Sequence, residues 1–233
     1  MLKKLLFILP FILFANALNA MRLEEYLIDT PTAKVAPVKT FNSTSRIFSE
    51  GGFVNFFTFT PFERFSIGTA ITIEHLVGTD DNDLKVLPPS LQLKTRLFDG
   101  TEILPIIALG FDNQGFYYDH DKDEYLQKAK GLYLVATQEL FLKDLIVNYG
   151  GNITTNGFEF EKLHGFVSLN YSITDYLDFI TEWDNIRNTR DSRWNAGIRF
   201  YLHPSLALDA AVRRIGRGSE SERILQIHYV TNF

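Results

Sequence analysis

Segments in which apolar and polar residues alternate recur along most of the chain, and this period of two is the feature that most restricts its fold. In LQLKTRL, at 91–97, the leucines fall on one face and the lysine and arginine on the other. Successive side chains of a β-strand point to opposite faces, so the pattern predicts strands with one apolar and one polar face. About twelve such strands are predicted, at 39–48, 53–60, 64–77, 89–98, 103–112, 129–140, 144–153, 163–172, 176–185, 193–202, 205–214 and 223–233.

The connections between these segments alternate in length. PFER, FDGTE, FLKD, TDY and HPS are short turns, whereas longer polar stretches lie at 78–88, 113–128, 154–162, 186–192 and 215–222. An even number of strands joined alternately by short periplasmic turns and longer extracellular loops is typical of outer-membrane barrels. The sequence therefore predicts an all-β fold over residues 39–233: a transmembrane antiparallel β-barrel of about 12 strands, with both termini in the periplasm.

The N-terminal residues have the pattern of a secretory signal. Lys3 and Lys4 precede the apolar run LLFILPFILF, and the small residues of ANALNA follow it. We predict a signal peptide over residues 1–20, cleaved after Ala20 or, as the second choice, after Ala17. No later stretch has the ~20 consecutive apolar residues of a transmembrane helix. The exported chain is therefore expected to be either soluble or a barrel.

A soluble β-sandwich would show the same alternation, because it also buries one face of each strand. The polar faces of the predicted strands, however, carry charges near their middle, and a dry sandwich core accepts buried ions only at high cost. The lumen of a barrel can pair such charges with water nearby. We predict a lumen charge ladder consisting of Glu182, Arg199, Asp209, Arg213, Lys94, Arg96 and Glu74.

Aromatic residues are abundant, with 21 Phe and 10 Tyr, and many lie near the ends of the predicted apolar faces. Outer-membrane barrels carry girdles of aromatic side chains at both membrane interfaces. We predict that the following aromatic side chains face lipid: Phe57, Phe59, Phe65, Phe98, Phe111, Tyr171, Trp183, Trp194 and Phe200.

The last predicted strand, ILQIHYVTNF, has Leu225, Ile227, Tyr229 and Phe233 on one face. This resembles the C-terminal signature by which barrel assembly machinery recognises outer-membrane proteins. Thr231 departs from it, because that position is usually apolar or aromatic.

Four stretches, LIDTPTAKV, TFNSTSRIF, AGIRFYLHPSLALDAAV and IHYVTNF, resemble the YjbH-like family of Gram-negative outer-membrane β-barrel proteins. The resemblance covers roughly residues 27–233. It implies residence in the outer membrane and, as for some members, an association with exopolysaccharide production. It implies no catalytic residues.

Residues 21–38, MRLEEYLIDTPTAKVAPV, do not alternate and contain Pro31 and Pro37. They are predicted to form either a periplasmic lead-in or a plug folded into the lumen, and the sequence favours neither.

Composition excludes some functions. The chain has no cysteine, so it has neither a disulfide framework nor thiolate chemistry. Without the two signal lysines, Lys+Arg falls from 23 to 21 against 28 Asp+Glu, a net charge of −7. Nucleic-acid binding needs a basic stripe, which the sequence lacks.

The histidines do not form a recognisable catalytic group. His75, His164 and His203 have no serine on the same face at the same depth, and His228 points inward beside no obvious partner. The acidic loop at 119–130 begins like a calcium-binding loop but lacks the glycine at its sixth position and the glutamate at its twelfth. We predict no catalytic residue, metal site or cofactor.

The main functional hypothesis is a non-enzymatic barrel that is structural or assists export of surface material such as exopolysaccharide. A narrow channel for small hydrophilic solutes is the first alternative, and a lipid-modifying enzyme the second. The expected location is the outer membrane of a Gram-negative bacterium. The expected partners are outer-membrane lipids, lipopolysaccharide and barrel assembly machinery, with a monomeric chain and no nucleic acid.

Overall fold

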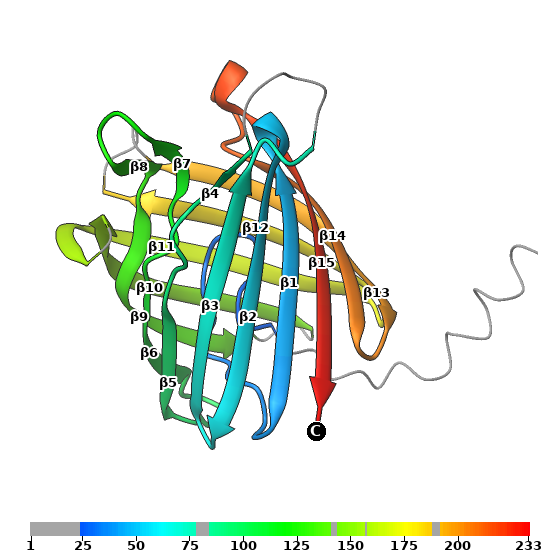
Figure 1. The fold of residues 1–233 in the computed structure, drawn as a ribbon. Coiled ribbons are helices and arrows are strands. Elements are labelled where there is room, and N and C mark those ends of the chain that lie inside the picture. The colour runs from blue at the N-terminus through cyan, green and yellow to red at the C-terminus, as the bar shows by residue number, and fades with distance from the viewer. Residues whose placement is uncertain (1–23, 78–83, 141–143, 157, 188–191) are drawn as a thin grey trace, which may run out of the picture.

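Twelve long strands close into one antiparallel barrel in the computed structural model (Figure 1). The structure describes residues 24–77, 84–140, 144–156, 158–187 and 192–233. The predicted signal peptide lies outside these residues. Among the described residues, none forms a helix long and apolar enough to cross a bilayer.

The strands follow one another around the barrel in chain order. They are β1 (Thr40–Phe48), β2 (Gly52–Phe62), β3 (Phe65–Glu74), β5 (Gln92–Phe98), β6 (Ile106–Asp112), β9 (Ala129–Glu139), β10 (Leu145–Asn156), β11 (Glu159–Thr174), β12 (Leu177–Ile186), β13 (Arg193–His203), β14 (Leu206–Arg213) and β15 (Glu222–Asn232). The two-residue strand β4 (Lys85–Val86) pairs with the end of β3. The ring closes where β1 pairs with β15, with Thr40 opposite Asn232. The predicted fold class is confirmed.

Two strands begin later than predicted because prolines precede them. β5 begins at Gln92, after Pro88 and Pro89, and β6 begins at Ile106, after Pro105. Proline has no amide hydrogen to donate to a neighbouring strand, so it marks the edge of the regular pairing.

Two of the predicted long loops are more ordered than expected. Most of 154–162 belongs to β10 and β11, which are joined at 157–158. The stretch 113–128 contains the hairpin of β7 (Phe116–Asp119) and β8 (Glu124–Gln127). Phe116 of this hairpin is buried in an apolar cluster with Phe48. Short helical turns, η3 (Ser49–Gly51) and η4 (Gly218–Glu220), occupy two further connections.

The two ends of the barrel differ. The connections at 63–64, 175–176 and 204–205 are two residues long, and we call this the short-turn end. The opposite end, which we call the long-loop end, contains 113–128 and 214–221. β1 begins and β15 ends at the short-turn end, as Figure 1 shows for the C-terminus.

The outer surface of the barrel is apolar and the inner surface is polar. Leu134, Leu169 and Phe179 are exposed on the outside, whereas Asn148 and Asn170 are buried on the inside. None of the nine aromatic side chains predicted to face lipid is buried, and Trp183 stacks on Trp194 with ring centroids 5.5 Å apart. This arrangement is the reverse of a soluble sandwich and suits a barrel surrounded by hydrocarbon.

A lysine in place of Leu134 should strongly impair folding into a bilayer. Leu134 lies at the middle of β9 and is 51% exposed on the outer surface. A lysine at the bilayer midplane costs about 2–4 kcal/mol of folding free energy. Leu126→Lys is the matched control, because Leu126 is also exposed, at 63%, but lies in the β7–β8 hairpin outside the barrel wall. Urea-induced unfolding in lipid vesicles measures both effects, and equal stabilities would contradict a lipid-facing β9.

Residues 24–36 lie inside the barrel, and 37–38 lead from them to β1 (blue in Figure 1). Residues 25–32 form a tight hairpin, in which the Leu27 N–H donates to the Thr30 carbonyl and the Thr32 N–H to the Glu25 carbonyl, both at 3.0 Å. We call residues 24–38 the internal segment and residues 27–30 its tip. The segment joins β1 at the short-turn end, and apolar side chains of the barrel pack around Leu27 and Ile28.

Candidate functional site

Glu182 holds the tip of the internal segment through its backbone. This glutamate points inward from β12 and is 1% exposed. Its carboxylate accepts hydrogen bonds from the N–H groups of Ile28, Asp29 and Thr30 at 2.8, 3.0 and 3.0 Å, and from the Thr30 hydroxyl at 2.7 Å. Asn195 donates to the same carboxylate at 2.9 Å. Successive N–H groups of a turn that converge on one point form an anion-binding concavity, and here the anion comes from the wall.

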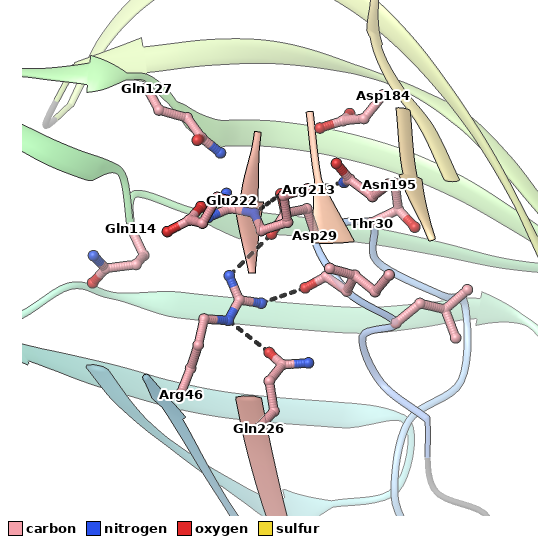
Figure 2. A network of polar contacts seen from close by, with 12 residues as sticks. Asp29, Thr30, Arg46, Gln114, Gln127, Asp184, Asn195, Arg213, Glu222 and Gln226 are labelled. Carbon is pink, nitrogen blue, oxygen red and sulfur yellow. Dashed lines mark hydrogen bonds and ion pairs between the residues drawn. The ribbon is translucent and has the colours of Figure 1, made fainter. Parts of the chain in front are cut away.

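Asp29 makes the reciprocal contact, with cations of the wall (Figure 2). Its carboxylate accepts from Arg46 Nη1 at 3.0 Å and from Arg213 Nε at 2.8 Å. Asn195 lies 3.4 Å from the same carboxylate. Burial alone would raise the pKa of the Asp29 carboxyl, but the neighbouring Arg213 and Arg46 outweigh burial and lower this pKa well below its usual range. Asp29 is therefore charged at neutral pH.

Both guanidinium groups have further partners. Arg46 Nε donates to Gln226 at 2.6 Å, and Arg46 Nη2 donates to the Ile28 carbonyl. Arg213 Nη1 donates to Glu222 at 2.7 Å. The ring of Phe116 lies beside both cations, with its centroid 5.0 Å from the Arg46 guanidinium carbon and 4.6 Å from that of Arg213. The loop hairpin therefore covers this pair from the long-loop end.

A second group of polar contacts holds the beginning of the segment. Asn170 and Tyr201 donate to the carboxylate of Glu24 at 2.8 and 2.5 Å. Lys94 Nζ donates to the carbonyl of Glu25 at 2.6 Å. Arg199 pairs with Asp209 at 2.7 Å, and its guanidinium also lies 3.4 Å from the Leu27 carbonyl. Side chains from many strands thus converge on one short stretch of chain.

The structure divides the seven residues predicted to form the charge ladder. Five of them, Glu182, Arg199, Asp209, Arg213 and Lys94, are buried in the lumen. The other two lie elsewhere. Arg96 pairs with Asp99 at 2.9 Å near the short-turn end, and Glu74 pairs with His120 at 2.8 Å at the long-loop end. Moreover, Glu182 has backbone N–H groups and Asn195 as partners, so the five do not make a simple chain of ion pairs.

The C-terminal signature residues face outward. Leu225, Ile227, Tyr229 and Phe233 are all exposed on the outer surface. The ring of Phe233 also stacks on that of Phe59, with centroids 5.4 Å apart.

Sequence reasoning missed Arg46, Asp29 and Asn195. Arg46 and Asn195 face inward by the same period-two count that identified Arg199, so alternation could have found them. No local pattern marks Asp29, because its partners lie at residues 46, 195 and 213.

The internal segment fills only part of the lumen. A cavity of about 110 Å³ lies beside Asp29, Arg46, Phe116 and Gln226. A single water occupies roughly 30 Å³ in the liquid, so this cavity holds only a few waters. A second cavity of about 420 Å³ opens at the long-loop end and is lined by Glu74, His120, Tyr117 and Glu222, among others. The internal segment therefore narrows the lumen, and the second cavity forms a vestibule at the long-loop end.

No family model and no curated protein matches the chain. Several solved structures do. One is a KdgM porin, at 9% identity and a TM-score of 0.57, covering 82% of this chain and 98% of that one. Another is the KdgM porin in complex with disordered oligogalacturonate, at 8% identity and a TM-score of 0.53, covering 83% of this chain and 99% of that one. The COG4313 outer membrane channel from Pseudomonas putida F1 is 10% identical, with a TM-score of 0.49, covering 88% of this chain and 100% of that one.

At these identities the likeness shows the fold alone. The chain has the fold of Gram-negative outer-membrane β-barrels, which agrees with the predicted location. The resemblance to the YjbH-like family remains a prediction, because no family model matches.

Proposed function

We propose that the protein is an outer-membrane channel for small hydrophilic solutes and that its internal segment closes the lumen. The observation that carries this proposal is the character of the wall around the segment. Asn148, Asn170, Glu182, Asn195 and Arg199 are buried there, and a wall of this polarity suits water and hydrophilic solutes once the segment leaves.

The way in which the segment is held also supports the proposal. It is joined to the barrel at β1, and its other contacts with the wall are non-covalent: hydrogen bonds, ion pairs of Asp29 and Glu24, and apolar packing at Leu27, Ile28 and Ala33. Water can replace each of these polar contacts, so the polar part of the attachment is reversible.

The structural neighbours agree with a channel rather than with an export scaffold. KdgM is named as a porin, and its fold is the one found here. The association with exopolysaccharide implied by the YjbH-like resemblance has no specific support in the arrangement of the lumen. We further propose that the protein is a monomer and that lipids and lipopolysaccharide surround its apolar outer surface.

Locking the segment in place tests the proposal. The Ala33 N–H donates to the Thr137 hydroxyl at 2.7 Å, so cysteines at these two positions lie close enough to be joined, and the chain has no other cysteine. We expect the wild-type protein in a planar bilayer to be mostly closed, with brief openings. Oxidised Ala33→Cys/Thr137→Cys should show no openings, and a reducing agent should restore them.

The two single-cysteine variants are the controls, because they cannot form the bond. Steady conductance that the oxidised lock does not change would place the solute path elsewhere and contradict a segment that closes the lumen.

A further inference from the structure

Two cations of the barrel wall aim at one point in the lumen. Arg46 on β1 and Arg213 on β14 belong to strands separated by β15 alone. Both side chains are buried, at 4% and 1% exposure. They meet at the Asp29 carboxylate, which each contacts within 3.0 Å, as Figure 2 shows. Burying two guanidinium groups so close together requires an anion between them.

In the part of the wall that the structure describes, the cations around Asp29 outnumber the carboxylates. Four cations act on Asp29: Arg46, Arg213, Arg193 and Lys130. Glu222 pairs with Arg213, and Asp184 pairs with both Arg193 and Lys130. Glu182, the third wall carboxylate, binds the tip. Without Asp29, four cations therefore face three carboxylates among the described residues, and the positive excess lies between Arg46 and Arg213.

The space between Arg46 and Arg213 contains further groups that can bind an anion. Arg213 Nη2 is buried and has no hydrogen-bond partner among the residues that the structure describes. The ring of Phe116 covers both guanidinium groups, and the cavity of about 110 Å³ adjoins Asp29 and Arg46. Asn195 adds an amide donor 3.4 Å from the Asp29 carboxylate. Two guanidinium groups, an amide and a flat apolar ring suit a carboxylate carried on a small ring or chain.

We propose that Asp29 occupies a carboxylate-binding site of the barrel wall, formed by Arg46, Arg213 and Asn195, and that a small solute bearing a carboxylate takes this site when the internal segment leaves it. The inference deepens the proposed function, on which it rests, by naming the solute class. The segment then acts as a built-in competitor, because its own carboxylate fills the site when the lumen is closed.

Removing the competitor tests the site itself. In Asp29→Ala, purified in detergent at neutral pH, acetate is small enough to take the place of the lost carboxylate. We expect acetate to raise the thermal unfolding temperature of this variant by several degrees more than chloride at the same ionic strength, and to leave the wild type unchanged. Equal effects of acetate and chloride would show general screening and overturn the proposal.

A matched pair of sugars tests the solute class. Glucuronate and glucose share a pyranose ring and differ at one carbon, which is a carboxylate in the acid. Isothermal titration should show at least tenfold tighter binding of glucuronate than of glucose to Asp29→Ala. Adding Arg46→Gln should remove this preference, since it removes one of the two cations. Equal binding of the two sugars, or a preference that survives Arg46→Gln, would overturn the site.

A second variant covers the case in which Asp29→Ala does not fold. Glu182→Gln keeps Asp29 but weakens the hold on the tip, so its channel current can be measured with each sugar present. Glucuronate should reduce this current at concentrations at which glucose does not. An ion current that glucuronate does not affect would support the proposed channel and refute the carboxylate site. Binding of glucuronate by a protein without any current would support the site and refute the channel.

Discussion

Replacing Glu182 with glutamine should open the lumen. The Glu182 carboxylate is the common acceptor for three backbone N–H groups and the Thr30 hydroxyl. An uncharged amide accepts more weakly and turns its NH₂ group toward at least one of these donors. The combined change disfavours docking of the tip by roughly 3 kcal/mol. Because about 1.4 kcal/mol corresponds to a factor of ten, the undocked fraction should rise about a hundredfold.

Single-channel recording in a planar bilayer measures this change as a higher open probability. Glu74→Gln is the matched control, because it makes the same substitution at a residue that pairs with His120 at the long-loop end. This control should remain as closed as the wild type. Because opening requires the internal segment to leave the lumen, a disulfide between cysteines at positions 33 and 137 should close the Glu182→Gln channel again. A folded Glu182→Gln protein that stays silent would mean that the barrel is permanently closed.

Arg213→Met should be the most destabilising single change among the lumen arginines. Arg213 is 1% exposed and pairs with both Asp29 and Glu222, at 2.8 and 2.7 Å. Methionine fills much of the same volume but leaves the buried Glu222 without its paired cation and Asp29 with Arg46 alone. Removing one partner of a buried ion pair costs about 3–5 kcal/mol. Urea-induced unfolding of the reconstituted protein gives the free energy of unfolding directly.

Arg64→Met is the control for this measurement. Arg64 pairs with Asp99 at the short-turn end, and both side chains are about half exposed. An exposed pair contributes no more than about 1 kcal/mol. Similar losses for the two substitutions would show that the lumen pairs are solvated and that the internal segment is only loosely docked.

The barrel could be predicted from the sequence because each strand carries its own period-two pattern. β13 alternates between outward apolar and inward polar residues, β12 does so except at Ile180 and Thr181, and the structure agrees at Glu182 and Arg199. In β1 the alternation is weaker, because its outward residues Ser43 and Ser45 are polar as well. Arg46 therefore did not stand out as an inward charge.

The contents of the lumen could not be predicted in the same way. The internal segment has no periodicity, and its partners are far away in the sequence: Ile28 binds Glu182, and Ala33 binds Thr137. The β7–β8 hairpin lies in a stretch whose acidic residues suggested a solvated loop. Its packing depends on Phe116, a single aromatic residue that meets Phe48 only in the closed barrel.

The position of Asp29 also concerns how the ring is completed. β1 and β15 are the first and last strands, and their pairing is the seam of the barrel. Asp29 joins Arg46 on β1 to Arg213 on β14, so it spans the last strand from the inside. The internal segment comes immediately before β1 and is therefore made before any strand of the wall. Asp29 thus also links the two sides of this seam, and it is synthesised before the strands that form the seam.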